Sequence, residues 1–249
     1  MALSKEFSWK RVFIEMFTIA GSILLAFAID AWWDEFRDRE DANIVLTSLH
    51  EELVQVEEFM SEHDQFVGAM QDSARQLLTA AIGRDQELGE KEIDRLLADL
   101  TWFVSETLFA VPELESLILN DELSLIDNSD LRRTLKMWRA RNQFFRGFVD
   151  LQARFHNERF MPYLENNSSL QQIYNVAEYM PGFPEQKFDV EKIELRELRS
   201  HSLLLDDPTF QNLLTQRIAR FDVMLSMRDA QYVTELRDLI TQIEHELAE

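Results

Sequence analysis

Residues 46–81, LTSLHEELVQVEEFMSEHDQFVGAMQDSARQLLTAA, decide the fold of this chain. Apolar side chains recur there at alternating steps of three and four residues, which is the a/d repeat of helices that pack along their length. The repeat has one polar member, His63, and runs through Leu46, Leu49, Leu53, Val56, Met60, His63, Val67, Met70, Ala74, Leu77 and Ala81. We therefore predict one long helix of a bundle or coiled coil, ending at Gly83 because glycine is favoured at helix C-termini.

Upstream of this repeat, the chain is apolar from Val12 to Ile29 and then carries an adjacent tryptophan pair, Trp32-Trp33. A helix over 12–33 is about 30 Å long at roughly 1.5 Å per residue, enough to cross a bilayer core, and tryptophan favours the lipid–water boundary. Residues 22–67 contain neither proline nor glycine, so this helix should run directly into the long one. The alternatives are a buried helix of a soluble protein and a cleaved signal peptide, for which Ala26-Phe27-Ala28 would be the cleavage site.

The net charge of −21 lies entirely on one side of the tryptophan pair. Residues 1–33 are neutral, so residues 34–249 form an acidic domain that follows a short N-terminus, 1–11, and the membrane helix. Lys5, Lys10 and Arg11 should hold the N-terminus in the cytoplasm by the positive-inside rule. In a bacterium, this topology places the bulk of the chain in the periplasm, anchored in the inner membrane. The acidic excess also disfavours nucleic acid as a partner.

Polar and small residues of the membrane helix fall on one face. They are spaced by three and four residues and comprise Glu15, Thr18, Ser22, Ala26 and Asp30. A carboxylate inside a bilayer normally faces protein or water, and small residues let two helix backbones approach closely. This stripe predicts a packing surface for a second copy or another membrane subunit. Two alternatives remain: Glu15 reaches the membrane surface while Asp30 lies at the other, or a ring of Glu15 side chains lines an oligomeric cation channel.

The rest of the chain reads as an all-α bundle of about four main helices with a loop-rich insertion over 163–190. We expect helices over 90–108, 113–119, 129–160, 170–179 and 208–247, with Asn128 and Asp206 or Asp207 as N-caps and Pro162 as a helix stop. In the second helix, Ile93, Leu96, Leu97, Leu100 and Phe103 should point inward. The last helix carries its own apolar repeat, in which Arg228 is the polar member, as His63 is in the first. Such polar residues most often set register or partner.

Catalytic and metal-binding motifs are absent. The chain has no cysteine, no Glu-x-x-His, no His-Glu-x-x-His, no G-x-S-x-G and no glycine-rich phosphate loop. We therefore expect no enzymatic activity and no cofactor. The aromatic residues Trp138, Phe145, Phe148 and Phe155 lie at helical spacing, which indicates core packing, with an apolar ligand pocket between helices as the alternative.

Two segments resemble a family of uncharacterised bacterial single-span inner-membrane proteins. The first is residues 20–35, AGSILLAFAIDAWWDE, with His50-Glu51-Glu52-Leu53 after it; the second covers 114–131. Where family members carry asparagines before the tryptophan, this chain has Asp30-Ala31. The resemblance implies the bacterial inner membrane and assigns no activity.

Together these observations predict a non-enzymatic, single-span membrane protein whose extracytoplasmic bundle acts in oligomeric assembly or protein interaction. A homo-oligomer formed through the span and the long helices is the expected assembly, with membrane lipid as its surroundings. The alternatives are the Glu15 channel and a ligand-sensing or regulatory subunit that signals through a membrane partner.

Overall fold

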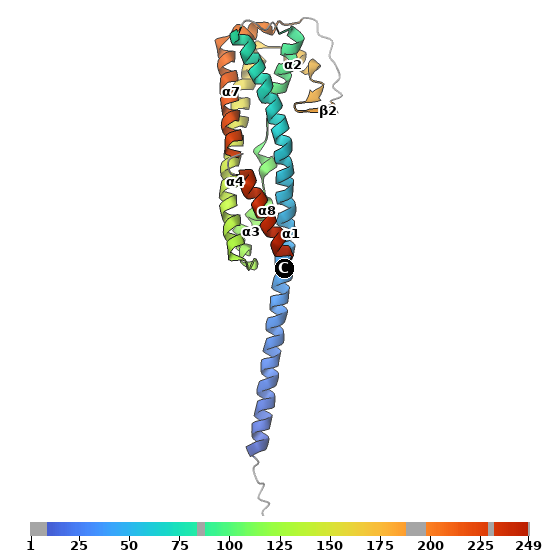
Figure 1. Cartoon of the computed structure of the whole chain (residues 1–249), viewed down its shortest axis with the longest axis vertical. Helices are drawn as coiled ribbons and strands as arrows, with labels where there is room; N and C mark the ends of the chain where they lie inside the picture. Colours follow the sequence, from blue (N-terminus) through green and yellow to red (C-terminus); the bar gives the residue numbers. More distant parts are fainter. Residues whose placement is uncertain (1–8, 84–87, 188–197, 229–231, 249) are drawn as a thin grey trace, which may run out of the picture.

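The computed structural model describes residues 9–83, 88–187, 198–228 and 232–248. One helix, α1 (Trp9–Gly83, 75 residues), runs the length of the molecule, and the other elements pack around its upper half (Figure 1). The predictions of an all-α fold and of a single helix ending at Gly83 are confirmed. Every residue from Glu15 to Asp41 is exposed, and burial begins at Ala42. We call residues 15–41 the stalk and residues 42–83 the upper half of α1.

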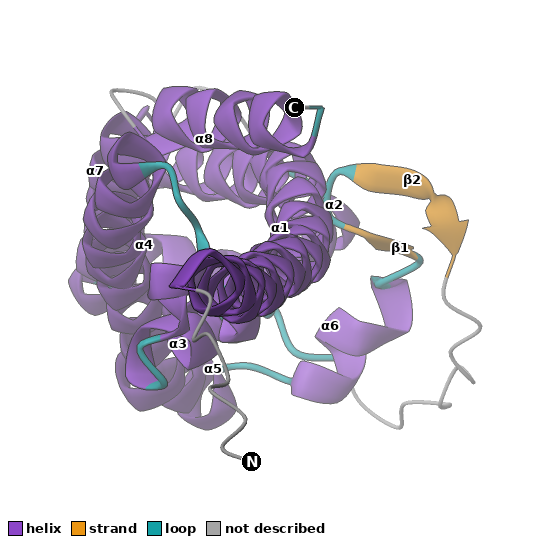
Figure 2. Ribbon diagram, turned by 90° about the horizontal axis from the view of Figure 1, so that it is seen from below, coloured by secondary structure: helices purple, strands orange, loops and turns teal. Residues whose placement is uncertain are grey.

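The predicted repeat of the upper half forms the centre of the core. Its members from Leu46 to Leu77 are all buried, His63 included, and Ala81 at its end is half-buried. Seen along the stalk, α4, α7 and α8 form an arc on one side of α1, while a small β-hairpin lies on another (Figure 2). The apolar stripe of α1 is thus buried against helices that come from distant parts of the sequence.

The second helix is shorter than predicted. Helix α2 (Glu90–Leu100) ends eight residues early and is followed by an extended segment and a 3₁₀ turn, η1 (Glu106–Phe109). The Thr101 hydroxyl donates to the carbonyl of Ala98, and the Trp102 carbonyl accepts from the buried Arg217 of α7. These bonds satisfy carbonyls that a longer helix would have used internally. Phe103, predicted to point inward, is 45% exposed.

The middle of the chain follows the predicted caps. Helix α3 (Pro112–Leu119) is confirmed; Asp121 then adopts a left-handed φ of 59° before the turn η2 (Glu122–Leu125). Asn128 Oδ1 accepts from the backbone N–H groups of Asp130 and Leu131 at 3.1 and 3.0 Å and starts α4 (Ser129–Phe155). The cap predicted from an Asn-Ser-Asp cluster therefore forms as expected.

Two long helices depart from the predicted boundaries. Pro162 does not end its helix, because a π-helical turn, η3 (His156–Phe160), widens the backbone before α5 (Met161–Asn167). The wider turn relieves the clash between the proline ring and a carbonyl in the preceding turn. The last predicted helix is two helices, α7 (Pro208–Met227) and α8 (Val233–Leu247), and α8 slants across the lower part of the bundle to α1 (Figure 1). Asp207 caps α7 through Thr209, with Pro208 at its first position.

The insertion contains a short helix, as predicted, and a β-hairpin, which was not predicted. Helix α6 (Leu170–Val176) lies within the expected 170–179, and strands β1 (Tyr179–Met180) and β2 (Phe183–Lys187) pair antiparallel. Residues 163–167 belong to α5, and residues 188–190 of the predicted insertion lie outside the described residues. At the hairpin turn, Gly182 has a φ of +79°, and an added Cβ would lie 2.4 Å from the Gln65 carbonyl oxygen of α1. The turn η4 (Ser202–Asp206) then leads into α7.

Candidate functional site

The stalk carries the predicted membrane features on an uncovered helix. Glu15, Thr18, Ser22, Ala26 and Asp30 are all exposed, and the Ser22 hydroxyl donates to the Thr18 carbonyl at 2.6 Å, within its own helix. Among the described residues, one helix is long and apolar enough to cross a membrane, and none of its apolar window is buried. The spacing places the five stripe residues on one face of the helix.

Aromatic and charged residues mark the upper end of the stalk. Trp32 and Trp33 are exposed and each packs on Phe36, with ring centroids 6.2 and 6.0 Å apart. The next turns carry exposed intrahelical ion pairs, Arg37 with Asp34 and Arg39 with Glu35. An aromatic belt followed by solvated charge is the order expected where a helix leaves a bilayer.

The two polar core residues singled out in the sequence, His63 and Arg228, both lie close to the Asp64 carboxylate. The Arg228 guanidinium forms an ion pair with Asp64 of α1, and His63 Nδ1 lies 3.8 Å from the same Asp64 side chain, too far for a hydrogen bond. Burial, and secondly the charge of Arg228, lowers the pKa of His63 to about 4, so its ring is neutral at pH 7. Phe109 packs edge-on against that ring at 5.3 Å.

A second buried cation, Arg217, was not predicted from the sequence. It is 2% exposed and donates to His156 Nδ1 at 3.0 Å and to the Trp102 carbonyl at 2.8 Å, with its guanidinium over the rings of Phe160 and Phe221. Burial lowers the pKa of Arg217 to about 9 and, together with the Arg217 charge, that of His156 to about 3. Its helical spacing from Leu214 and Phe221 was the available signal. These contacts fix the end of α2 to α7.

A buried acid–histidine pair fastens the insertion. His201 Nε2 accepts the Ser169 backbone N–H at 2.9 Å, so its proton sits on Nδ1 and is donated to Asp94. The side-chain amide of Gln172 bonds the other oxygen of Asp94 at 2.9 Å. A hydrolase would need a hydroxyl nucleophile where Ser169 presents its backbone N–H. The pair therefore holds α2, α6 and the segment before η4 together.

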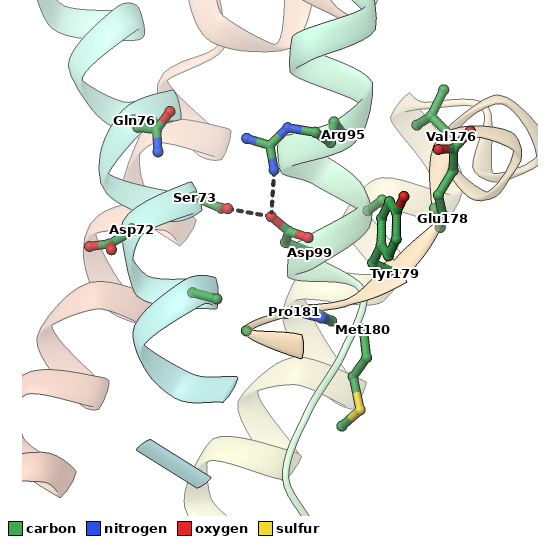
Figure 3. A pocket seen from close by; sticks show the side chains of 14 residues that line it. Asp72, Ser73, Gln76, Arg95, Asp99, Val176, Glu178, Tyr179, Met180 and Pro181 are labelled. Carbon is green, nitrogen blue, oxygen red and sulfur yellow. Dashed lines mark hydrogen bonds and ion pairs between the residues drawn. The ribbon is translucent and has the colours of Figure 1, made fainter. Parts of the chain in front are cut away.

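A groove of about 380 Å³ lies between α1, α2 and the hairpin (Figure 3). At its base, Asp99 accepts hydrogen bonds from the Ser73 hydroxyl at 2.6 Å and from Arg95 at 3.3 Å. Burial raises the pKa of Asp99, and these two bonds oppose that rise. The lining residues include no histidine to activate Ser73, and no group of three metal-ligating side chains occurs in the described ranges. Within the groove, Asp99 thus connects Ser73 of α1 with Arg95 of α2.

The aromatic residues predicted as core or as a pocket mostly fill the core. Tyr232, the N-cap residue of α8, stacks on Phe145 at 4.8 Å and lies 5.8 Å from Trp138, and its hydroxyl donates to Asn142 at 2.9 Å. Phe155 is buried, with Arg220 over its ring, and Phe148 is half-buried against Phe144. Trp138 and Phe145 are thus closed in by Tyr232, which the sequence did not place beside them.

A second apolar line runs along the outside of α4. Met137, Phe144 and Leu151 are seven residues apart and 61%, 61% and 48% exposed, and the exposed small residues Ala140 and Gly147 lie between them. The buried face of the same helix carries Leu131, Leu135, Trp138, Asn142, Phe145, Val149 and Gln152. We call the exposed line the α4 outer stripe; its heptad spacing is that of a helix that packs against another helix.

Comparisons of the chain with protein-family models, with curated proteins and with solved structures found no match.

Proposed function

We propose that this protein is a single-span membrane protein, without enzymatic activity, whose extracytoplasmic bundle acts in oligomeric assembly or protein interaction. The observation that carries the proposal is the contrast within α1. An apolar stalk that the rest of the chain leaves uncovered continues without interruption into a half that is buried along its predicted repeat.

The membrane assignment rests on the energetics of the stalk. Its exposed large apolar side chains include Phe17, Leu24, Leu25 and Phe27, each above 60% exposed. Apolar surface in water costs roughly 25 cal/mol per Å², and soluble monomers rarely leave a continuous apolar surface of this length uncovered. A bilayer removes that cost. Lys5, Lys10 and Arg11 support a cytoplasmic N-terminus, and with the family resemblance they favour the bacterial inner membrane with the bundle in the periplasm.

Assembly is supported by two uncovered stripes on one rod-like molecule. The stalk offers Glu15, Thr18, Ser22, Ala26 and Asp30, and the bundle offers the α4 outer stripe. Two copies anchored in one membrane have parallel stalks, so a two-fold axis between them runs along the stalk. Their α4 helices would then pack parallel, with Phe144 of one copy against Phe144 of the other. We propose a homo-oligomer on these grounds.

The topology can be tested cleanly because the chain has no cysteine. We would express Ser4→Cys and Ser61→Cys separately in a bacterium and treat intact spheroplasts with a membrane-impermeant maleimide. The proposal expects labelling of the bundle variant alone, and of both variants after lysis. Labelling of Ser4→Cys alone would reverse the orientation, and recovery of the unlabelled protein in the soluble fraction would remove the membrane assignment.

The assembly is tested by native mass spectrometry of the detergent-purified chain. We expect a discrete oligomer that Phe144→Glu weakens, since the new carboxylates would face each other across the interface. Asn157→Glu, an equivalent change at an exposed position off the stripe, is the matched control. Glu15→Gln tests the stalk stripe in the same way. A strict monomer in the unmodified protein would contradict the homo-oligomer.

A further inference from the structure

An apolar cavity of about 210 Å³, open to solvent on one side, lies where three distant segments of the chain meet. The upper half of α1 contributes one wall, the extended segment after α2 and Leu108 of η1 contribute a second, and the hairpin contributes the third. The apolar lining side chains are Phe59, Phe66, Trp102, Phe103, Val104, Leu108, Met180 and Phe183. Phe59, Phe103 and Leu108 are each at least 40% exposed and mark the side that opens to solvent.

His63 is the polar residue of the inner wall. It lines the cavity and is 5% exposed, and neither of its ring nitrogens has a hydrogen-bond partner among the described residues. Asp64, the nearest carboxylate, is 3.8 Å away and is held by Arg228. Burying an imidazole without a hydrogen-bond partner carries the cost of its lost hydration. A group that reached this ring from the cavity would recover part of that cost.

The size of the cavity and the charge of its lining narrow the class of ligand that fits it. A dry cavity of about 150 Å³ is known to admit benzene, so this larger one has room for a single ring with a small substituent. Glu62 is the charged residue in the lining, and it is exposed at the rim, where it disfavours anions. The aromatic walls favour a flat ring that can pack edge-on or offset against them.

We propose that this cavity binds a small uncharged aromatic molecule with one hydrogen-bonding group, of the size and chemistry of a phenol, with its ring against the edge-to-face pair of Phe66 and Trp102, whose ring centroids are 6.1 Å apart, and its polar group toward His63. Such a ligand ties the hairpin and the segment after α2 to the upper half of α1. The site does not depend on the proposed membrane anchoring or assembly, so either proposal can fail alone.

The test uses the full chain in detergent micelles, titrated calorimetrically with phenol, benzene and benzoate after subtraction of the heats from micelles alone. Phenol should bind saturably with one site per chain, benzene at least tenfold more weakly, and benzoate not measurably. His63→Phe keeps a ring at this position and removes the polar atoms, so it should reduce the preference for phenol over benzene to near unity. His245→Phe, the same change on the exposed face of α8, is the control and should leave it unchanged.

A second variant guards against an effect of His63 on folding. Leu108→Trp enlarges a partly exposed side chain at the opening and should abolish phenol binding, with the helical circular dichroism spectrum unchanged. Phenol binding that persists in Leu108→Trp, an unaltered preference in His63→Phe, or no saturable phenol binding to the unmodified chain would each overturn the proposal.

Discussion

The stalk and the upper half of α1 belong to one helix, yet the rest of the chain covers the upper half and leaves the stalk exposed. Both are rich in apolar residues. In the upper half these residues recur every three or four positions and are covered by α2, α7 and α8. In the stalk up to Trp33 they cover most of the helix outside the polar stripe, and every residue from 15 to 41 is exposed. The arrangement of apolar residues around the helix, rather than their number, therefore decides which part the chain covers with its own side chains.

The largest difference between the halves should appear when one leucine is truncated in each. Leu53 is fully buried, whereas Leu24 is 69% exposed. Leu53→Ala should lower the free energy of unfolding of the bundle by about 2–5 kcal/mol, because it removes packed methyl groups and leaves a cavity. Leu24→Ala should leave it unchanged. Chemical denaturation followed by circular dichroism in detergent measures both, and equal effects would mean that the two halves are covered alike.

A titratable residue in the buried half should make the bundle sensitive to acid. The pKa of His63 is about 4 in the fold against 6.5 for an exposed histidine, so the unfolded chain binds its proton first. Its contribution to stability is full above pH 6.5 and is lost as the pH falls toward 4. At pH 5 the loss is about 2 kcal/mol, and His156, with a pKa of about 3, adds a similar amount.

The variant His63→Phe isolates the part of this pH dependence that belongs to α1. Between pH 7.5 and pH 5, it should lose about 2 kcal/mol less stability than the unmodified chain does, with the contribution of His156 intact. Denaturant midpoints at the two pH values measure the difference. An identical acid sensitivity in both proteins would show that His63 is not held neutral in the core.

Adding one methyl group at Gly182 should break the contact between the hairpin and the upper half of α1. Gly182→Ala introduces a Cβ at a φ of +79° and within 2.4 Å of the Gln65 carbonyl oxygen. The left-handed conformation alone costs about 1–2 kcal/mol, and the close approach forces the hairpin to shift. Gly147→Ala, where an added Cβ meets nothing within 4 Å, is the control. Hydrogen exchange of the hairpin amides should accelerate in the first variant and not in the second.

The smallest effect is expected in the stalk. Arg39 and Glu35 form an ion pair at 2.8 Å, with both side chains mostly exposed. Arg39→Ala should change bundle stability by less than about 0.5 kcal/mol, because exposed pairs spaced four residues apart are weak. Denaturant titration tests this, and a loss above 1 kcal/mol would indicate that the stalk packs against another part of the protein.

Periodicity and capping chemistry made most of the fold predictable from the sequence. The repeat from Leu46 to Ala81, the Asn128 cap and the Asp207-Pro208 helix start all depend on neighbouring residues and were correct. The end of α2 was not predictable in this way, because Arg217, over a hundred residues later, takes up the Trp102 carbonyl. Nor was the passage through Pro162, which depends on a π-helical turn, or the division of the last helix into α7 and α8.

The candidate sites were likewise predictable where they depend on neighbouring residues and not where they depend on distant ones. The stalk stripe and the tryptophan pair follow from local spacing. The cavity beside His63 does not, since its walls come from α1, from the segment after α2 and from the hairpin. The polar character of His63 within an apolar repeat was the one visible sign of it. The pattern of a single sequence can identify a polar residue within an apolar repeat, but tertiary contacts determine which side chains surround it.

Because α1 is unbroken, the candidate span and the bundle share one helical phase. Ala42 follows Trp33 by nine positions along the helix, which sets the bundle about 13 Å above the tryptophan pair and fixes its rotation relative to the polar stripe of the stalk. Adding two residues to this segment would turn the stripe by about 200° beneath an unchanged bundle, whereas adding seven would nearly restore its direction and raise the bundle by about 10 Å. The helix therefore fixes both the distance and the rotation between the candidate span and the bundle, so that rotating one end rotates the other.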